Sequence, residues 1–197
     1  MSRLFIRLFD VLFSLTGLIL LSPVFLVVVI IIMIDSPGGP LFRQARVGRN
    51  DRDFTLYKFR TMKTGAADKG LTVGEKDTRI TRAGAWLRKV KLDELPQLYN
   101  VLKNDMSLVG PRPEVRKFVI HYTPGQRRVL TVKPGITDYA SIEYSDENAI
   151  LGRAVNPEET YVNVIMPHKI ELNMKFIDEP TVRNYFKILV KTVGILR

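Results

Sequence analysis

The feature that most constrains this chain is a run of 24 residues, from Val11 to Ile34, without a charged side chain. As one straight helix the run would be about 36 Å long, and the hydrocarbon core of a bilayer is about 30 Å thick. A signal peptide fits poorly, because the apolar stretch is too long and no small-residue cleavage site follows it. The core of a soluble domain rarely needs so many uncharged residues in succession. We therefore expect a membrane-embedded segment.

The middle and the flanks of this segment bear on whether it crosses the membrane or turns back within it. Ser22-Pro23 falls at the centre, where the proline removes a backbone donor and should kink the helix, and the hydroxyl of Ser22 can help to satisfy a freed carbonyl. Each half is only about 18 Å long, and a spanning helix usually carries positive charge on one side. Basic residues on both flanks favour a re-entrant hairpin, with a kinked spanning helix as the alternative; they are Arg3, Arg7, Arg43, Arg46, Arg49 and Arg52.

The chain has no evident internal repeat, and residues 43 to about 180 are predicted to form one compact, loop-rich α/β unit. A turn cluster over 35–42 ends the membrane segment. Alternating aromatic and β-prone residues over 53–62 predict a strand, and a Gly-rich polar stretch over 65–79 predicts a mobile loop. Thr81 is placed to cap a helix through about Val90; its predicted apolar face holds Trp86, Leu87 and Val90.

A second helix is predicted by the leucine spacing that ends at Leu102. Asp93 is suited to cap it, and Pro96 would then lie in the first turn, where a missing N–H costs nothing. Asp93 and Glu94 would therefore sit at the positive end of a short helix, an end that also binds phosphate.

The C-terminal segment, about 181–197, repeats apolar residues at helical spacing, with a row of Arg183, Lys187 and Lys191 on another face. Such a basic amphipathic helix can lie on an anionic membrane. It can equally pack on the domain with a solvated basic face, and the residues do not decide between the two.

Composition bounds the chemistry further. Thirty Lys and Arg against 20 Asp and Glu give a net charge of +10, which predicts an anionic partner: nucleic acid, a membrane surface or a phosphorylated substrate. Without cysteine the chain has no disulfide or thiol nucleophile, which suits a reducing compartment. Its two histidines lie 47 residues apart, so a histidine-based zinc site is improbable.

An acidic pair, Asp93 and Glu94, lies within this basic sequence. Arg112, held between two prolines after a glycine, has few conformations and binds phosphate in a planar, two-pronged way. Neighbouring cations should depress the carboxylate pKa values. Ionised carboxylates among phosphate-binding cations suit Mg²⁺ binding or nucleophilic attack on phosphorus, and fit a glycosidase pair less well. The cations that could converge on the pair, and that we predict to bind the substrate, are Lys58, Arg60, Arg88 and Arg112.

Four motifs in succession resemble a known family: GPLFRQARVGRN, YKFRTM, TRAGAWLRKVKLDELPQLYNVLKNDMSLVGPRPE and RRVLTVKPGIT. The chain is identified by them as similar to the bacterial sugar transferases, the monotopic phosphoglycosyl transferases of small PglC type. The likeness runs from the N-terminal membrane segment to about residue 139, roughly 70% of the chain.

The resemblance implies a reaction and a setting. Such enzymes move a sugar-1-phosphate from a UDP-sugar to polyprenyl (undecaprenyl) phosphate and release UMP, using Mg²⁺, at the cytoplasmic face of the bacterial inner membrane. It implies that Asp93 is the nucleophile of a covalent phosphosugar-aspartyl intermediate and that Glu94 holds Mg²⁺ or orients phosphates. Lys58, Arg88 and Arg112 would bind phosphate or nucleotide. The family's membrane helix is re-entrant and broken at Ser-Pro, here Ser22-Pro23.

The likeness weakens after residue 137. Asp138 stands where many members have glycine, Ser141 where many have glutamine, and Asn173 where many have an acid, although Asp178 keeps a second acidic position. These departures fall where the sugar could be selected, so the sugar remains open while the reaction class does not.

The resulting prediction is a helix-rich α+β (α/β) domain on the cytoplasmic face, residues 37–197, with a re-entrant membrane helix over 1–36 and amphipathic interfacial helices. Inner-membrane lipids, a UDP-sugar and polyprenyl phosphate are the expected partners. A membrane-tethered nucleic-acid-binding module is disfavoured, because an acidic pair stands among the basic residues and no RNA-binding or zinc-finger motif is present. A scaffold without activity and a phosphatase that uses Asp93 are not excluded by the residues.

Overall fold

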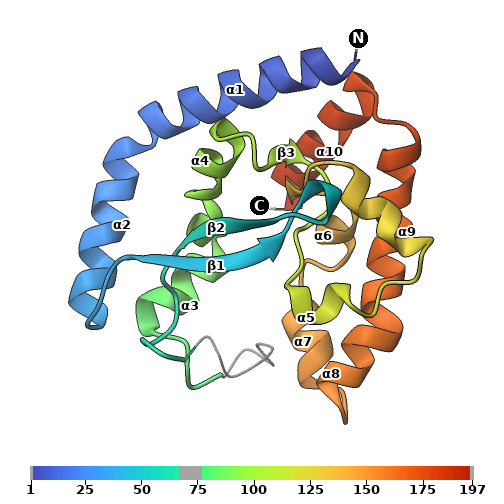
Figure 1. The fold of residues 1–197 in the computed structure, drawn as a ribbon. Helices are drawn as coiled ribbons and strands as arrows, with labels where there is room; N and C mark the ends of the chain where they lie inside the picture. The colour runs from blue at the N-terminus through green and yellow to red at the C-terminus, as the bar shows by residue number, and fades with distance from the viewer. Residues whose placement is uncertain (1, 67–76, 196–197) are drawn as a thin grey trace.

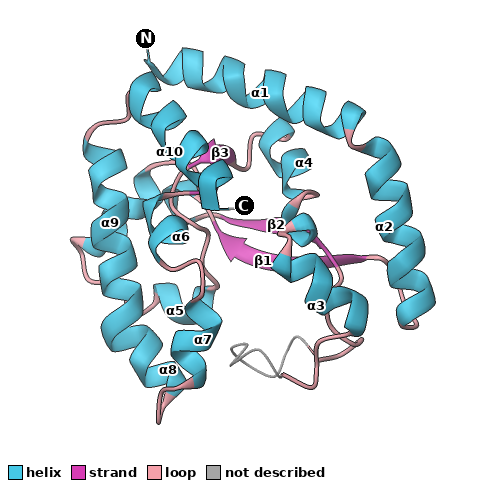
Figure 2. Cartoon of the chain, turned by 180° about the vertical axis from the view of Figure 1, so that it is seen from behind, coloured by secondary structure: helices cyan, strands magenta, loops and turns pink. Residues whose placement is uncertain are grey.

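The computed structural model describes residues 2–66 and 77–195 and has the predicted helix-rich α+β character. Figure 1 shows α1 along the top of the molecule, α2 descending beside the β1–β2 hairpin, and α5 to α9 on the opposite side; Figure 2 gives the reverse view. The first half contains α1 (Ser2–Leu20), α2 (Ser22–Asp35), β1 (Leu41–Val47), a 3₁₀ turn (Arg49–Asp51), β2 (Asp53–Phe59), α3 (Arg82–Lys89), a 3₁₀ turn (Leu92–Glu94) and α4 (Gln97–Leu102). The second half contains β3 (Ser107–Val109), α5 (Arg116–Val119), a 3₁₀ helix (Gln126–Thr131), β4 (Gly135–Thr137), α6 (Tyr139–Glu143), α7 (Glu147–Gly152), α8 (Pro157–Thr160), a π-helical turn (Tyr161–Ile165), α9 (Met166–Asp178) and α10 (Val182–Ile195).

The apolar run forms two helices that meet at Ser22-Pro23 with a bend of 61°. The Ser22 hydroxyl donates to the Ile19 carbonyl at 2.8 Å, the carbonyl whose helical partner would have been the N–H that Pro23 lacks. The predicted kink and the predicted role of Ser22 are therefore confirmed. In the part of the chain described, neither helix by itself has the length and apolar character of a membrane span; only the bent pair taken together does.

Polar contacts that the sequence did not reveal fix α1 to the rest of the molecule. The buried Asp10 carboxylate accepts hydrogen bonds from the Ser107 hydroxyl at 3.0 Å, the Leu108 N–H at 2.9 Å and the Tyr185 hydroxyl at 2.9 Å. Arg7 donates to the Val101 carbonyl at the end of α4, where a helix leaves carbonyls without partners. The first helix is thus bound to β3, α4 and α10 at once.

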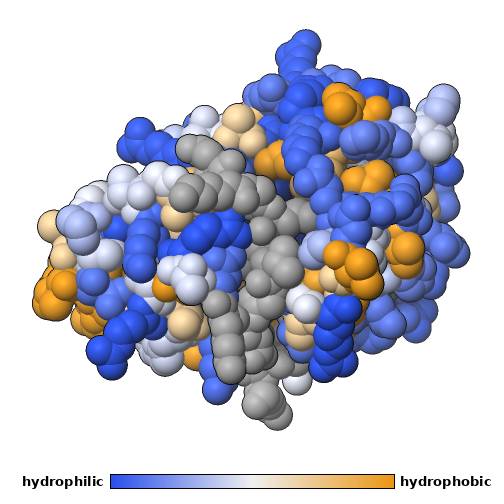
Figure 3. Space-filling model, turned by 90° about the horizontal axis from the view of Figure 1, so that it is seen from below, coloured by the Kyte–Doolittle hydropathy of each residue, from blue (hydrophilic) through white to orange (hydrophobic). Residues whose placement is uncertain are grey.

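The apolar side chains of α1 and α2 divide into two sets. Val28 and Ile32 are buried against Phe59 of β2 and Leu87 of α3, so α2 contributes to the core. Many large apolar side chains point outward instead: Leu4, Phe5, Leu8, Leu12, Leu15, Ile19, Leu20, Leu26, Val27, Ile30, Met33 and Ile34. The face of the molecule opposite α1, seen in Figure 3, is by contrast largely hydrophilic.

Two small sheets carry the loops of the site. β1 and β2 are antiparallel, with Leu41 opposite Phe59 and Val47 opposite Asp53; the predicted strand over 53–62 is present but ends at Phe59, and its partner β1 was not predicted. β3 and β4 are parallel. The loop predicted over 65–79 lies largely outside the described residues.

Helix α3 begins where the sequence predicts. Thr81 accepts a hydrogen bond from the Gly84 N–H at 3.0 Å, and Asp35 at the end of α2 accepts one from the Ala83 N–H at 3.1 Å. The predicted apolar face is wrong in part. Leu87 is fully buried, but Trp86 and Val90 are exposed, because β2 and α2 cover only one side of this short helix.

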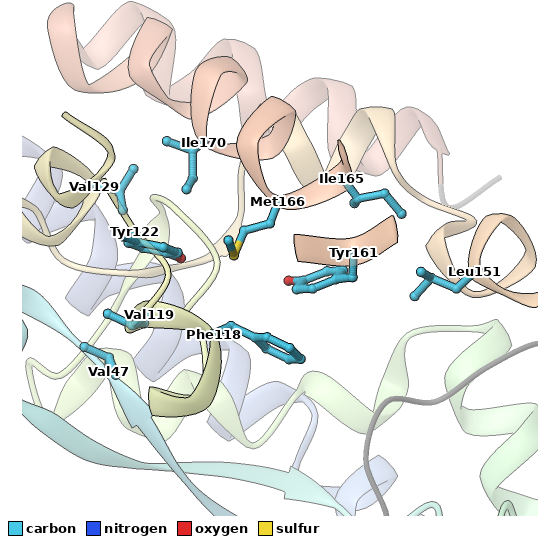
Figure 4. Packing of buried hydrophobic residues seen from close by; sticks show 10 residues of the cluster. All are labelled: Val47, Phe118, Val119, Tyr122, Val129, Leu151, Tyr161, Ile165, Met166 and Ile170. Atoms are coloured by element: carbon cyan, nitrogen blue, oxygen red, sulfur yellow. The ribbon is translucent and has the colours of Figure 1, made fainter. Parts of the chain in front are cut away.

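The largest core cluster lies on the side of the molecule away from α2. It joins β1, α5, the 122–129 segment, the π-turn and α9, as Figure 4 shows. A second cluster joins β2, α4, β3 and α10, with Ile6 and Phe9 of α1 packed against it. Tyr185 and Ile188 fix α10 in that cluster, whereas its Val190 and Val193 are exposed.

Candidate active site

The acidic pair lies in a tight turn between α3 and α4. Lys91 adopts a left-handed conformation (φ 57°) that ends α3, and the Leu95 N–H bonds the Leu92 carbonyl three residues back. Helix α4 then begins at Gln97, so Asp93 does not cap it and the predicted cap is wrong. The reason is that the 3₁₀ turn directs the Asp93 side chain into the protein, where it is 7% exposed.

Glu94 is held by two cations from different elements. Lys58 of β2 donates to Oε1 at 3.0 Å, and Arg112 contacts both oxygens, with its Nη1 3.2 Å from Oε2 and its Nη2 bonded to Oε1. Burial alone would raise the pKa of Glu94, but the charges and hydrogen bonds of Arg112 and Lys58 outweigh it and lower that pKa well below its usual range. Glu94 is therefore a fixed negative charge.

Asp93 has the opposite character. No group among the described residues donates a hydrogen bond to its carboxylate, although Lys58, Arg88 and Arg112 act on it electrostatically. Burial raises its pKa; Lys58 opposes this rise and the neighbouring charge of Glu94 adds to it. The predicted depression of both carboxylate pKa values is thus confirmed for Glu94 and wrong for Asp93, because Glu94 takes the direct contacts with the cations.

The two remaining arginines of the predicted site have different surroundings. Arg88 of α3 donates its Nε–H to the Thr61 hydroxyl at 2.9 Å, while its terminal nitrogens have no hydrogen-bond partner among the described residues, and its charge attracts Asp93. Arg60 is buried and commits all five N–H donors to the turn after α2. Its partners are the carbonyls of Ser36, Pro37, Gly38 and Gly39 and the Ser36 hydroxyl. Arg60 has no N–H left to donate to a phosphate, so its predicted role in substrate binding is wrong.

The loop that carries Arg112 is fixed by a close backbone crossing. A Cβ on Gly135 would lie 2.1 Å from the Gly110 nitrogen, so only glycine permits this approach. From the other side, Arg46 of β1 donates to the Pro113 carbonyl at 2.9 Å. These contacts hold the Arg112 guanidinium against Glu94.

Asp138 holds the same loop and was noted in the sequence only as a departure from the family. Its carboxylate is 1% exposed and accepts hydrogen bonds from the Arg112 N–H at 2.7 Å and from Asn173 Nδ2 at 2.9 Å. It also caps α6 through the Ser141 N–H. The residue type was the local signal that could have suggested this role, since aspartate is favoured as a helix cap.

Asn100 is a second residue that sequence reasoning missed. Its side chain bonds the Tyr57 N–H at 3.1 Å and the Thr55 carbonyl at 2.7 Å, on the edge of β2 that β1 does not cover. Helix α4 is thereby fixed to the strand that carries Lys58. The spacing between Lys58 and the acidic turn depends on this contact.

A metal ion has few candidate ligands here. Among residues 2–66 and 77–195, no group of three or more His, Asp or Glu side chains is arranged to hold one. Mg²⁺, however, is commonly bound by one or two carboxylates together with substrate phosphates. The uncommitted Asp93 carboxylate and the remaining lone pairs of Glu94 fit that donor set.

Comparison with known proteins identifies the family. A family model described as bacterial sugar transferase matches residues 1–197, the whole chain. The chain belongs to the bacterial sugar transferase family. The resemblance carried by the four sequence motifs is therefore confirmed.

Three relatives illustrate the range of this family. A UDP-N-acetylgalactosamine-undecaprenyl-phosphate N-acetylgalactosaminephosphotransferase of Aeromonas hydrophila is 38% identical over 159 residues, 79% of this chain and 36% of that protein. A UDP-glucose:undecaprenyl-phosphate glucose-1-phosphate transferase of Escherichia coli (strain K12) is 35% identical over 196 residues, 98% of this chain and 40% of that protein. An uncharacterized sugar transferase, EpsL, of Bacillus subtilis (strain 168) is 42% identical over 144 residues, 73% of this chain and 70% of that one. This chain thus spans well under half the length of the first two relatives.

Proposed function

We propose that this chain transfers a sugar-1-phosphate from a UDP-sugar to undecaprenyl phosphate or a similar polyprenyl phosphate and releases UMP. The observation that carries the proposal is the contrast between the two carboxylates. Asp93 is buried with no hydrogen bond from the described residues, while Glu94 beside it is held by Lys58 and Arg112. Family membership and the names of the relatives support the same reaction class.

The first step is attack of an Asp93 carboxylate oxygen on the β-phosphorus of the donor. A bond forms between Asp93 and phosphorus, and the bond from that phosphorus to the bridging oxygen breaks. The bridging oxygen leaves with its electron pair as part of UMP. A carboxylate whose oxygens are not engaged in hydrogen bonds keeps its lone pairs for this attack.

The second step regenerates the enzyme. An oxygen of the polyprenyl phosphate attacks the same phosphorus, and the bond to Asp93 breaks with return of the carboxylate. Arg88, Arg112 and Lys58 supply positive charge where negative charge gathers on phosphate oxygens. Phosphoryl transfer depends mainly on such positioning and charge neutralisation.

Mg²⁺ is the proposed cofactor, held by Asp93 and Glu94 with the donor phosphates. When bound, it would neutralise charge on the diphosphate and on the departing UMP. The role of Lys58 and Arg112 in this setting is to fix the position of Glu94.

We also propose that residues 1–36 form a re-entrant membrane helix and that residues 37–197 lie on the cytoplasmic face of the inner membrane. The bend at Ser22-Pro23, the outward apolar side chains of α1 and α2 and the basic residues beside them support this placement. Helix α10, which exposes Val190 and Val193 next to Lys187 and Lys191, is proposed to rest on the lipid surface.

The test is UMP release from a panel of UDP-sugars by detergent-solubilised protein with Mg²⁺, with and without undecaprenyl phosphate. We expect lipid-dependent release with at least one donor and loss of release in Asp93→Asn. The matched control is Asp146→Asn, the same change at an exposed position. With donor labelled in the β-phosphate, wild-type protein quenched in the absence of lipid should carry label, and Asp93→Asn should not.

Three results would count against the proposal. Near-normal turnover by Asp93→Asn would remove Asp93 as the nucleophile. Inorganic phosphate without a lipid-linked product would indicate a phosphatase. Absence of UMP release with every donor would favour a scaffold without catalytic activity.

A further inference from the structure

A small cavity lies beside the Arg112 loop, on the side away from α2. Its volume is about 30 Å³, room for about two water molecules. Figure 4 shows five of its lining side chains, contributed by the 122–129 segment, the π-turn and α9; they are Tyr122, Val129, Tyr161, Met166 and Ile170. Arg112, Glu114, Lys169 and Asn173 complete the polar part of the lining.

Asn173, one of the residues that line this cavity, has an unpaired acceptor. The side chain is 5% exposed, and its Nδ2 donates to Asp138 at 2.9 Å. This bond fixes the orientation of the amide, because the opposite orientation would set two acceptors against each other. The atom left over is Oδ1, which is buried and has no partner among the described residues.

Glu114 presents a second unpaired acceptor. Its Oε1 accepts a hydrogen bond from the Tyr161 hydroxyl at 2.8 Å, whereas its Oε2 is buried without one. Buried polar atoms nearly always have a hydrogen-bond partner. Both exceptions belong to residues that line one cavity, next to a π-helical turn of the kind that often marks functional sites. A group that donates hydrogen bonds would satisfy them.

The cavity is connected to the proposed active site through Arg112. This residue lines the cavity, bonds Glu94 through its guanidinium and bonds Asp138 through its backbone N–H. In the proposed reaction, a donor phosphate bound at Arg112 would bring its attached sugar close to the cavity, because Arg112 lines the cavity and also bonds Glu94. The volume is too small for a sugar ring and suffices for one substituent of it.

We propose that the cavity receives a hydrogen-bond-donating substituent of the donor sugar, a hydroxyl or an acetamido N–H, and that Asn173 Oδ1 selects it. The inference rests on the proposed function, since it requires a UDP-sugar at the acidic turn. Asn173 is a specificity-determining residue in this arrangement. The sugar ring stays at the mouth of the cavity, and its substituent replaces the water that would otherwise satisfy Asn173 and Glu114.

The test is a binding cycle between the sugar and Asn173. Affinities of the Mg²⁺-supplemented, detergent-solubilised full chain are measured for UDP, for UDP-glucose, UDP-galactose and their N-acetylamino counterparts, and for monodeoxy analogues of the donor that binds tightest. Wild type should disfavour one analogue by about 10- to 100-fold, the cost of leaving a buried acceptor unpaired. Asn173→Leu should bind that analogue and the parent donor within about threefold of each other.

Controls separate the possible failures. Asn163→Leu, the same change at an exposed position, should keep the wild-type discrimination. UDP affinity should be equal in all folded variants, because UDP lacks the transferred sugar. Ile170→Phe, which fills the cavity, should lower the affinity for UDP-sugars and leave the affinity for UDP unchanged. If wild type and Asn173→Leu discriminate equally between the parent donor and its deoxy analogue, the inference is overturned and the cavity holds only buried water. If UDP-sugars bind with the expected discrimination but no UMP is released, the proposed reaction is refuted while the proposed sugar-binding role of the cavity stands.

Discussion

Asp138 and Asn173 both lie in the stretch where the sequence resemblance to the family weakens, and in the structure their side chains are hydrogen-bonded to each other. We predict that Asp138→Gly destabilises the protein strongly and that Asn173→Asp, added to it, restores part of the loss. The physical reason is that one buried acid is needed at this place, next to the Arg112 N–H. The double change moves the acid from position 138 to position 173.

The magnitude follows from the bonds that Asp138 accepts. Removal of the cap of α6 costs about 1 kcal/mol, and each buried donor left unpaired, the Arg112 N–H and Asn173 Nδ2, costs about 1–3 kcal/mol. Because water can enter and relieve part of this, we expect a loss of about 3 kcal/mol. For a chain of this size that lowers the apparent melting temperature by roughly 6–12 °C.

The assay is thermal unfolding in detergent of wild type, both single variants and the double variant. Asn173→Asp alone should also destabilise, since it sets two buried carboxylates against each other. The double variant should be more stable than the sum of the single changes by about 0.5–3 kcal/mol. Strict additivity of the two changes would refute the idea of a shared acid.

Three further predictions concern the acidic turn and the bend between α1 and α2. Burial raises the pKa of Asp93, so the native state binds the Asp93 proton more tightly than the unfolded chain does. The native state therefore loses stability as the pH rises from the unfolded pKa through the folded pKa. Asp93→Asn should melt at a higher temperature than wild type at neutral pH and this difference should close on acidification, so a pH-independent difference would contradict the reasoning. Gly84→Ala places a Cβ 2.1 Å from the Thr61 carbonyl oxygen. It should lower the free energy of unfolding by about 1–3 kcal/mol and reduce UMP release, because it moves Arg88. Gly125→Ala, which has open space around it, should change neither quantity. Pro23→Ala should straighten the bent helix pair, and labelling of the N-terminus that still reports the cytoplasmic side would show that the proline is not what turns the chain.

Contacts that only tertiary packing creates decide which member of the acidic pair is uncommitted. Both residues belong to one turn. Lys58 precedes that turn in the sequence and Arg112 follows it, and both contact Glu94. Asp93 is left buried without a hydrogen bond from the described residues. The resulting opposite pKa shifts have one cause, because charge pairing at one carboxylate leaves burial to dominate at the other.

Features with local causes could be predicted from the residues alone. A proline in an apolar run bends a helix whatever surrounds it, and Ser22 lies within reach of the freed carbonyl three residues back. Thr81 caps α3 through an N–H three residues ahead. The motifs around Asp93 and Arg112 were also sufficient to identify the family.

Long-range polar partners, in contrast, are set by how the chain packs. Arg60 resembled its neighbours as a phosphate ligand, yet a turn 21 to 24 residues away takes all its donors. Asp10 is satisfied by Tyr185, 175 residues along the chain, and Asp138 by Asn173, 35 residues along. A buried polar group needs a hydrogen-bond partner, and packing decides which residue supplies it. No local pattern in the sequence encodes how far along the chain that partner lies.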